Sequence, residues 1–116
     1  MPDSVCSIYQ EGTTGSLTSV NSPGTATTID CRNFSSGLIA IRNSGATNTL
    51  QYSIASYANV TPSTAGVADV ATTDIAPNTT VTYAWSNAPR ASRIVTIIPK
   101  VGGSQSTYII EHCLGV

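Results

Sequence analysis

The sequence predicts an all-β fold, a single antiparallel β-sandwich that is jelly-roll-like and has about seven to nine strands. Three observations predict it. Ser and Thr make up about a quarter of the chain, and β-branched residues suit the pleated surface of a sheet. Several segments alternate apolar and polar residues with a period of two. Turn-forming residues separate these segments at the spacing of an antiparallel sandwich.

The length of 116 residues fits one domain, because domains typically hold about 100–150 residues and a second core would lack apolar material. No internal repeat, linker or sustained helical periodicity is visible in residues 1–116. The Gly-, Ser- and Thr-rich stretch ending at Gly24 predicts a loop or an extended N-terminal arm within residues 1–24. The start, Met1–Ser4, shows no basic segment followed by an apolar run, so no secretory signal peptide is expected.

Two segments alternate with the period of a half-buried strand. In residues 49–55 every second residue is large and apolar. Residues 81–85 show the same alternation, with Val81, Tyr83 and the single tryptophan, Trp85, on one face. We therefore predict that these three side chains point inward and that their strand lies in the middle of the core.

Three further segments, residues 38–41, 94–98 and 108–113, are nearly continuous apolar runs. Such a run is typical of a central strand covered on both faces, or of a strand whose outer face meets a partner. Weaker strands are predicted at residues 5–10, 26–31 and 66–71. Turn-forming residues stand between the strands, at Ser22–Gly24, Asn43–Gly45, Thr61–Ser63, Ala76–Asn78, Ala88–Arg90 and Gly102–Ser104.

The chain carries very little charge. Only 9% of its residues are charged, against roughly 25% in ordinary soluble domains, and the net charge is −1. Nucleic acid and anionic membranes are not expected partners, because both require clustered Lys and Arg. No stretch approaches the roughly 20 apolar residues of a membrane span. Because a surface with few charges resists association poorly, we expect part of it to be buried in a larger assembly.

The inventory of reactive side chains is thin, so no enzymatic activity is predicted. The single histidine, His112, follows Glu111 on a predicted strand, where adjacent residues point to opposite faces and cannot pair as base and orienting acid. Asp69, Asp74 and Asn78 lie near a turn and make a calcium site conceivable, but their spacing matches no EF-hand loop and solvated carboxylates are commoner. We predict no cofactor and no metal.

The three cysteines, Cys6, Cys31 and Cys113, are odd in number and widely spaced. This spacing does not match a zinc site, which is normally built from closely spaced pairs. The simplest interpretation is that they are buried thiols that act as small apolar residues. A bridge between Cys6 and Cys31 stays open, because sequence alone does not establish the pairing.

Positive charges are so few that their positions carry information. Arg90 and Arg93 precede one apolar run and Arg42 follows another. They are either scattered solvated charges or anchors that bind acidic or carbonyl groups of a partner. We predict Arg93, Arg90 and Arg42 as interface residues, with Arg93 the first to test. Tyr57 joins them as an aromatic residue available for surface contact.

A resemblance to a known family enters in the central segment. Residues 41–54, IRNSGATNTLQYSI, resemble a pattern in small tailed-phage virion proteins, in which an apolar strand ends in an Asn-Thr-Gly-like turn followed by Asn-x-Leu-x-Tyr-x-Ile. Residues 75–78 before a Val-x-Tyr strand, and residues 91–97, resemble later strands of the same proteins. The likeness covers residues 36–112. Asn43 and Gly45 also suit a β-hairpin turn, where both residue types tolerate positive φ.

The resemblance implies a β-sandwich or jelly-roll-like subunit attached to a capsid or another virion part, often as a trimer. The specific hypothesis is a capsid decoration protein that binds the major capsid protein in a virion assembled in the host cytoplasm. Two alternatives stay open. One is a carbohydrate- or receptor-binding module of a fibre that uses exposed aromatics such as Tyr57. The other is a self-polymerising filament subunit in which a strand completes a neighbour's sheet.

Overall fold

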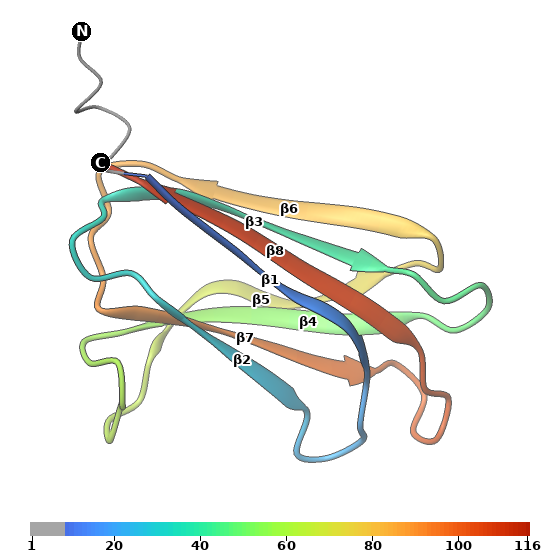
Figure 1. Cartoon of the computed structure of the whole chain (residues 1–116). Helices are drawn as coiled ribbons and strands as arrows, with labels where there is room; N and C mark the ends of the chain where they lie inside the picture. The colour runs from blue at the N-terminus through green and yellow to red at the C-terminus, as the bar shows by residue number, and fades with distance from the viewer. Residues whose placement is uncertain (1–8) are drawn as a thin grey trace, which may run out of the picture.

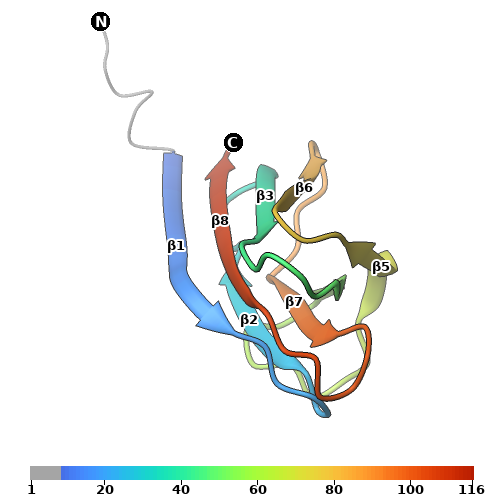
Figure 2. The ribbon, with the colours of Figure 1, turned by 90° about the vertical axis from the view of Figure 1, so that its right-hand side faces the viewer.

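In a computed structural model, which describes residues 9–116, the chain forms two four-stranded antiparallel sheets packed face to face (Figure 1). The strands are β1 (Tyr9–Thr18), β2 (Thr25–Asp30), β3 (Ser36–Asn43), β4 (Leu50–Tyr57), β5 (Val67–Ile75), β6 (Thr79–Trp85), β7 (Ser92–Pro99) and β8 (Thr107–Gly115). One sheet has the order β1-β8-β3-β6 and the other the order β2-β7-β4-β5. Figure 2 shows the strands of the first sheet side by side in that order.

Consecutive strands lie in opposite sheets, except β4 and β5, which pair directly with each other. The chain therefore winds back and forth between the two layers, as in an eight-stranded jelly roll. The predicted antiparallel, jelly-roll-like sandwich is confirmed. The weaker strands predicted at residues 26–31 and 66–71 correspond to β2 and β5, whereas most of residues 5–10 lies outside the described residues.

The core lies between the two sheets, and the period-two alternation decides which residues enter it. In β4 every second residue from Leu50 is buried, as predicted for residues 49–55. Ile39, Ile41 and Ile110 face it from the other sheet and are at most 1% exposed. The buried apolar side chains are Ile29, Cys31, Ile39, Ile41, Leu50, Tyr52, Ile54, Ile75, Val95, Ile97, Tyr108, Ile110 and Leu114.

The strand that carries Trp85 has the predicted inward face but not the predicted position. Val81, Tyr83 and Trp85 pack against the core, and the rings of Tyr83 and Trp85 are stacked with centroids 5.6 Å apart. Their strand, β6, is an edge strand and not a central one. Its other face is Thr-rich, and Thr80 and Thr82 are exposed there. Polar side chains suit this outer face, because no second layer covers it.

The three apolar runs form β3, β7 and β8, all interior strands of their sheets. Of the two alternatives, the strand covered on both faces is wrong, because a two-layer sandwich covers each sheet on one side only. The outward residues of these strands include Leu38, Ile94, Ile98 and Ile109, which are exposed or only partly buried. These outward apolar side chains leave the second alternative, contact with a partner, as the open question.

Part of the segment predicted to be a loop or arm forms β1. It pairs with β8 along the edge of the first sheet, and its register shifts between Thr13 and Ser16. Gly15 adopts φ of 67° inside this bulge, a conformation that favours glycine. Thr14 Oγ1 accepts a hydrogen bond from the Ile110 amide at 3.1 Å and so holds the bulge against β8.

The turn predicted at Asn43–Gly45 is a corner between sheets and not a hairpin, because β3 and β4 lie in different sheets. We expected Asn43 and Gly45 to occur here because they tolerate positive φ. This expectation is wrong, since neither residue has positive φ. Asn43 is instead fully buried and bonds the corner through its side-chain amide. Gly45 leaves space for Ser106, whose side chain a Cβ at this position would strike.

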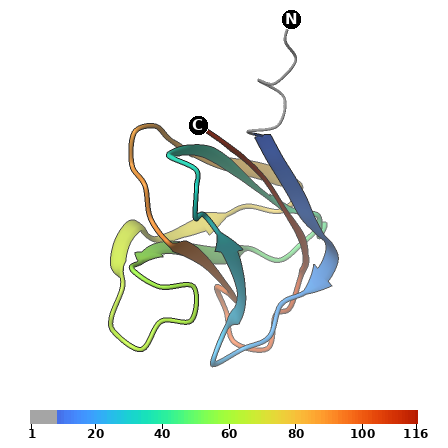
Figure 3. The same cartoon turned by 60° about the vertical axis from the view of Figure 1, so that its left-hand side comes forward.

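One end of the sandwich, which we call the loop end, collects the connections β2–β3, β4–β5 and β6–β7 together with the end of β8. It lies on the left in Figure 1. Figure 3 brings it forward and shows the long β4–β5 connection, residues 58–66, projecting from the second sheet. Residues that are distant in sequence therefore meet at this end.

Candidate functional site

The structure separates the predicted interface arginines. Arg93 lies on the inner face of β7 and is 1% exposed. Its Nε donates to Asp69 Oδ2 at 3.2 Å, and its Nη2 donates to the carbonyl oxygen of Ala88 at 3.0 Å. The guanidinium carbon lies 3.8 Å from the centroid of the Trp85 ring. The expected exposure of Arg93 is thus corrected, since the side chain joins β7 to β5 and to the β6–β7 connection.

The strand register explains this burial. Arg93 shares the inward face of β7 with Val95 and Ile97, and the carboxylate of Asp69 compensates its charge between the sheets. Ser56 Oγ donates a hydrogen bond to the same carboxylate. Asp69, one of the three residues considered for calcium, therefore serves in an ion pair.

Arg90 and Tyr57 meet at the loop end. Both line a hollow of about 520 Å3, and the other residues that line it come from the β2–β3, β4–β5 and β6–β7 connections and from Val116. The Ala91 amide donates to the Tyr57 carbonyl at 3.1 Å, which ties the β6–β7 connection to the end of β4. The sequence predicts Arg90 and Tyr57 as interface residues but does not predict that they lie close together. Only the fold shows this.

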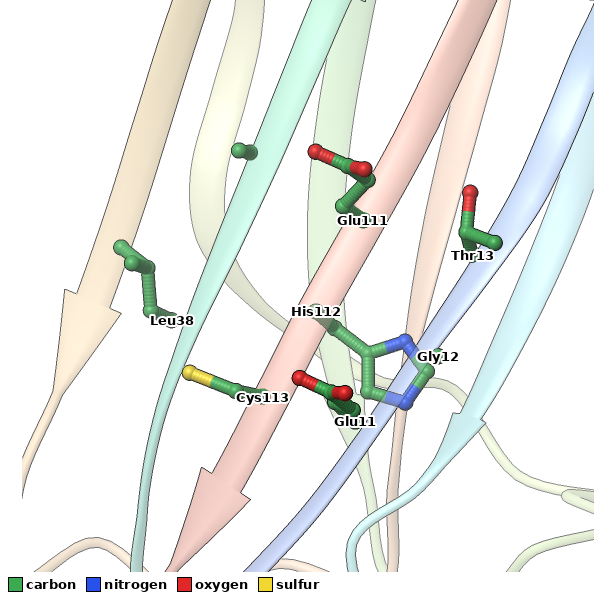
Figure 4. Close-up of a pocket in the computed structure, with 8 residues that line it drawn as sticks. Glu11, Gly12, Thr13, Leu38, Glu111, His112 and Cys113 are labelled. Atoms are coloured by element: carbon green, nitrogen blue, oxygen red, sulfur yellow. The ribbon is translucent and has the colours of Figure 1, made fainter.

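Arg42 belongs to a different surface, the outer face of the β1-β8-β3-β6 sheet. We call this surface the β8 face; its residues are Glu11, Thr13, Leu38, Ala40, Arg42, Ile109, Glu111 and Cys113. Figure 4 shows the part of it around β8, where a hollow of about 570 Å3 opens between β1 and β3.

The β8 face mixes exposed or partly buried apolar side chains with the charged residues Glu11, Arg42 and Glu111. Leu38 is 39% exposed, although it is a large aliphatic side chain on an interior strand. Arg42 and Glu111 line a smaller hollow of about 120 Å3 on the same face, so opposite charges lie close to each other there. Neither Leu38 nor Ile109 is among the interface residues predicted from the sequence. The unbroken apolar run in each strand could have identified them, because such a run places apolar side chains on both faces. It is also necessary to know which residues of the strand point outward.

His112 packs against β1 beside the hollow of the β8 face. Its neighbour Glu111 is exposed on the β8 face, whereas His112 is half-buried and its imidazole lies over Gly12 of β1 (Figure 4). A Cβ at Gly12 would lie 2.6 Å from Cε1 of the ring, so glycine is what admits the imidazole. Burial lowers the pKa of His112 from its ordinary value of 6.5.

This lowered pKa predicts a pH dependence of stability. Because the unfolded chain binds the proton more readily than the folded one, stability falls as the pH drops below about 6.5 and continues to fall until the folded-state pKa is passed. Thermal unfolding at pH 7.5 and at pH 5 should show a lower Tm at pH 5. In His112→Gln, which cannot take up the proton, that drop should shrink; an unchanged drop would assign it to other groups.

The cysteines show no bridge among the described residues. Cys31 is buried and Cys113 is half-buried on the β8 face, and neither forms a disulfide within residues 9–116. Burial raises the pKa of the Cys31 thiol, which disfavours the reactive thiolate. Cys6 lies outside the described residues, so the possible Cys6–Cys31 bridge stays a prediction.

Residues 9–116 contain neither a cluster of metal ligands nor a membrane-spanning helix. No group of three or more His, Cys, Asp or Glu side chains there could hold a metal ion, and Asp74 is paired with Lys100. That same part of the chain contains no helix long and apolar enough to cross a membrane.

No protein-family model and no curated protein matches this chain. Among solved structures, the SPBc2 prophage-derived protein YomS is similar with a TM-score of 0.54 at 11% identity, covering 94% of this chain and 96% of that one. A Bacillus endospore appendage protein, from a novel family of disulfide-linked pili, has a TM-score of 0.50 at 14% identity, covering 94% and 89%. The Tobacco streak virus coat protein, at 11% identity over 95% and 87%, reaches 0.43, too low to carry an argument. Similar structures thus include a prophage protein, pili and a coat protein, and the first two establish a shared fold.

Proposed function

We propose that this chain is a non-enzymatic structural subunit that works by packing its β8 face against neighbouring protein surface in a virion. The observation that carries the proposal is the β8 face itself, with an exposed leucine and partly buried Ile109 and Cys113 on interior strands. Exposed aliphatic groups on an otherwise regular sheet are typical of surfaces that bind protein. Arg42 on β3 and Glu111 on β8 supply charges of both signs within this face, which would fix the register of such contacts.

The specific form of the proposal is a capsid decoration protein. A decoration protein stabilises a shell because it binds the assembled lattice better than free subunits, and mass action then favours the intact particle. Support comes from the resemblance of residues 36–112 to tailed-phage virion proteins and from the jelly-roll topology, which capsid domains use widely. The partner would be the major capsid protein, and the subunit itself would form a closed oligomer, with a trimer favoured.

A second candidate, a filament subunit, is favoured by one specific observation. The fold is shared with a protein of disulfide-linked pili over 94% of this chain, and Cys113 presents a free thiol on the β8 face. Subunits of a filament make head-to-tail contacts that do not close, whereas a decoration subunit stops at a closed oligomer. The two candidates therefore differ in what the isolated protein does in solution.

The decoration proposal predicts that purified protein co-sediments with expanded capsids of the virus that encodes it and raises their disruption temperature. Leu38→Glu should abolish co-sedimentation, because it replaces the exposed leucine of the β8 face with a charged side chain. Thr28→Glu is the matched control, since it adds the same charge to an exposed position of β2 in the other sheet and should bind normally.

Light scattering of the isolated protein, with and without reductant, separates the two candidates. A fixed, small mass supports the decoration subunit. A mass that grows with protein concentration and falls when reductant is added would instead support the filament subunit and contradict the decoration subunit. Failure to bind any capsid form, together with a monomeric mass, would overturn both candidates.

A further inference from the structure

The hollow at the loop end is a second surface feature that the proposed packing of the β8 face does not use. Its volume of about 520 Å3 falls in the range of ~300–1,000 Å3 that is typical of ligand pockets. It is open to solvent, and the residues that line it include two aromatic residues, Phe34 and Tyr57, together with Pro89, Arg90 and Asn33. Figure 3 shows the connections from which these residues come.

The Tyr57 ring is held in place before any ligand arrives. A Cβ at Gly66 would lie 2.6 Å from both Cε2 and Cζ of the ring, so the ring packs against the bare backbone of the β4–β5 connection. The Tyr57 carbonyl is bonded to the Ala91 amide at 3.1 Å. An aromatic wall that is fixed in this way loses little entropy when a ligand stacks on it.

Arg90 brings a positive charge that the described residues do not neutralise. Its Nη1 donates to the carbonyl of the adjacent Pro89 at 2.8 Å, while the ion pairs within residues 9–116 use Arg32, Arg93 and Lys100. Arg90 is exposed and is the one arginine or lysine among the residues that line the hollow. A single guanidinium suits one carboxylate, whereas a phosphate-rich ligand would need several cations.

The remaining polar groups suit hydroxyls. Asn33 and Ser35 line the hollow, and Asn33 is held at φ of 74°, with its side chain at the exposed rim. An amide and a hydroxyl both donate and accept hydrogen bonds, which matches sugar hydroxyls.

We propose that the loop-end hollow binds a uronic acid unit of an acidic polysaccharide. The apolar C–H face of the sugar ring stacks on Tyr57, the carboxylate receives hydrogen bonds from Arg90, and the ring hydroxyls reach Asn33 and Ser35. The combination of an aromatic wall, one unpaired guanidinium and neutral polar groups identifies this ligand class over neutral sugars, which leave Arg90 unused, and over acidic peptides, which leave the hydroxyl-binding groups unused.

The test is a calorimetric titration of the full chain with tetragalacturonic acid and with its methyl ester, which keeps the shape and removes the charge. The acid should bind, and the ester should bind about tenfold more weakly, which corresponds to one charge-assisted contact. Arg90→Ala should weaken binding of the acid by the same factor and leave binding of the ester unchanged. Lys100→Ala, which removes the same charge at the opposite end of the sandwich, is the matched control and should bind like the wild type.

Four results would overturn the inference: no binding of the acid by the folded wild type, equal binding of acid and ester, equal weakening by Lys100→Ala, or equally tight binding of a tetraglutamate peptide. None of them bears on the β8 face, so the proposed packing function stands or falls separately. Circular dichroism of each variant confirms that the sandwich is intact before binding is measured.

Discussion

Replacing Asp69 with alanine is expected to lower the free energy of unfolding by about 3–5 kcal/mol, because it leaves a buried guanidinium without its counter-charge. Arg93 is 1% exposed, and the Asp69 side chain that faces it at 3.2 Å is 10% exposed. The Arg93 guanidinium therefore has almost no contact with water that could replace its counter-charge. Urea denaturation followed by tryptophan fluorescence measures the change, since Trp85 stacks on the same guanidinium.

The network around Arg93 explains why its partner is hard to replace. Arg93 Nη1 is buried and has no hydrogen-bond partner among the described residues, so the guanidinium already lacks one bond. Without Asp69, Nε would lose its acceptor as well, and Ser56 would lose the acceptor of its hydroxyl. A buried donor without an acceptor costs about 1–3 kcal/mol, and a charged one costs more.

Two control variants make the result interpretable. Asp74→Ala removes an exposed carboxylate whose partner Lys100 is also exposed, and its effect should fall near the error of the measurement because solvent screens the pair. The double variant Arg93→Met with Asp69→Leu should recover most of the stability lost in Asp69→Ala, since apolar groups of similar size often replace a buried pair without loss. If Asp69→Ala were as mild as Asp74→Ala, the ion pair would not support the fold.

Much of the fold could be predicted because alternation reports burial directly. The period-two pattern of residues 49–55 matches β4, and the inward face of β6 was predicted from residues 81–85. Sheet order was not predictable, because pairing of β1 with β8 joins the two ends of the chain, and local sequence does not encode such distant neighbours. The residues around Asn43 likewise suit a hairpin, because local sequence does not encode that β3 and β4 lie in different sheets.

The candidate site was predictable only in its parts. Tyr57 and Arg90 were identified by residue type and by the low charge of the chain, but their meeting at the loop end depends on three connections and a strand end. Arg93 carried the same signal as Arg90 and lies inside, because its register position places it on the inner face of β7. A charged side chain on a strand predicts exposure only when no opposite charge faces it across the core.

The second large effect is expected at Asn43, the buried amide that builds the corner between β3 and β4. Its Nδ2 donates to the carbonyls of Asn48 at 2.8 Å and Ile75 at 3.0 Å. Its Oδ1 accepts from the Gly45 amide at 3.1 Å and from Ser106 Oγ at 2.7 Å. All four bonding positions of the amide are therefore used, and they join β3, the corner, the end of β5 and the start of β8.

Asn43→Ala should lower the free energy of unfolding by about 4 kcal/mol, because each of the four lost bonds contributes roughly 1 kcal/mol and the partners stay buried. Asn48→Ala is the control: its Nδ2 donates one bond, to the Gln105 carbonyl at 2.7 Å, so its loss should be about a quarter as large. Urea denaturation of both variants gives the comparison. Equal losses would mean that Asn43 contributes no more than a single bond, and that the corner is held by Gly45 packing against Ser106.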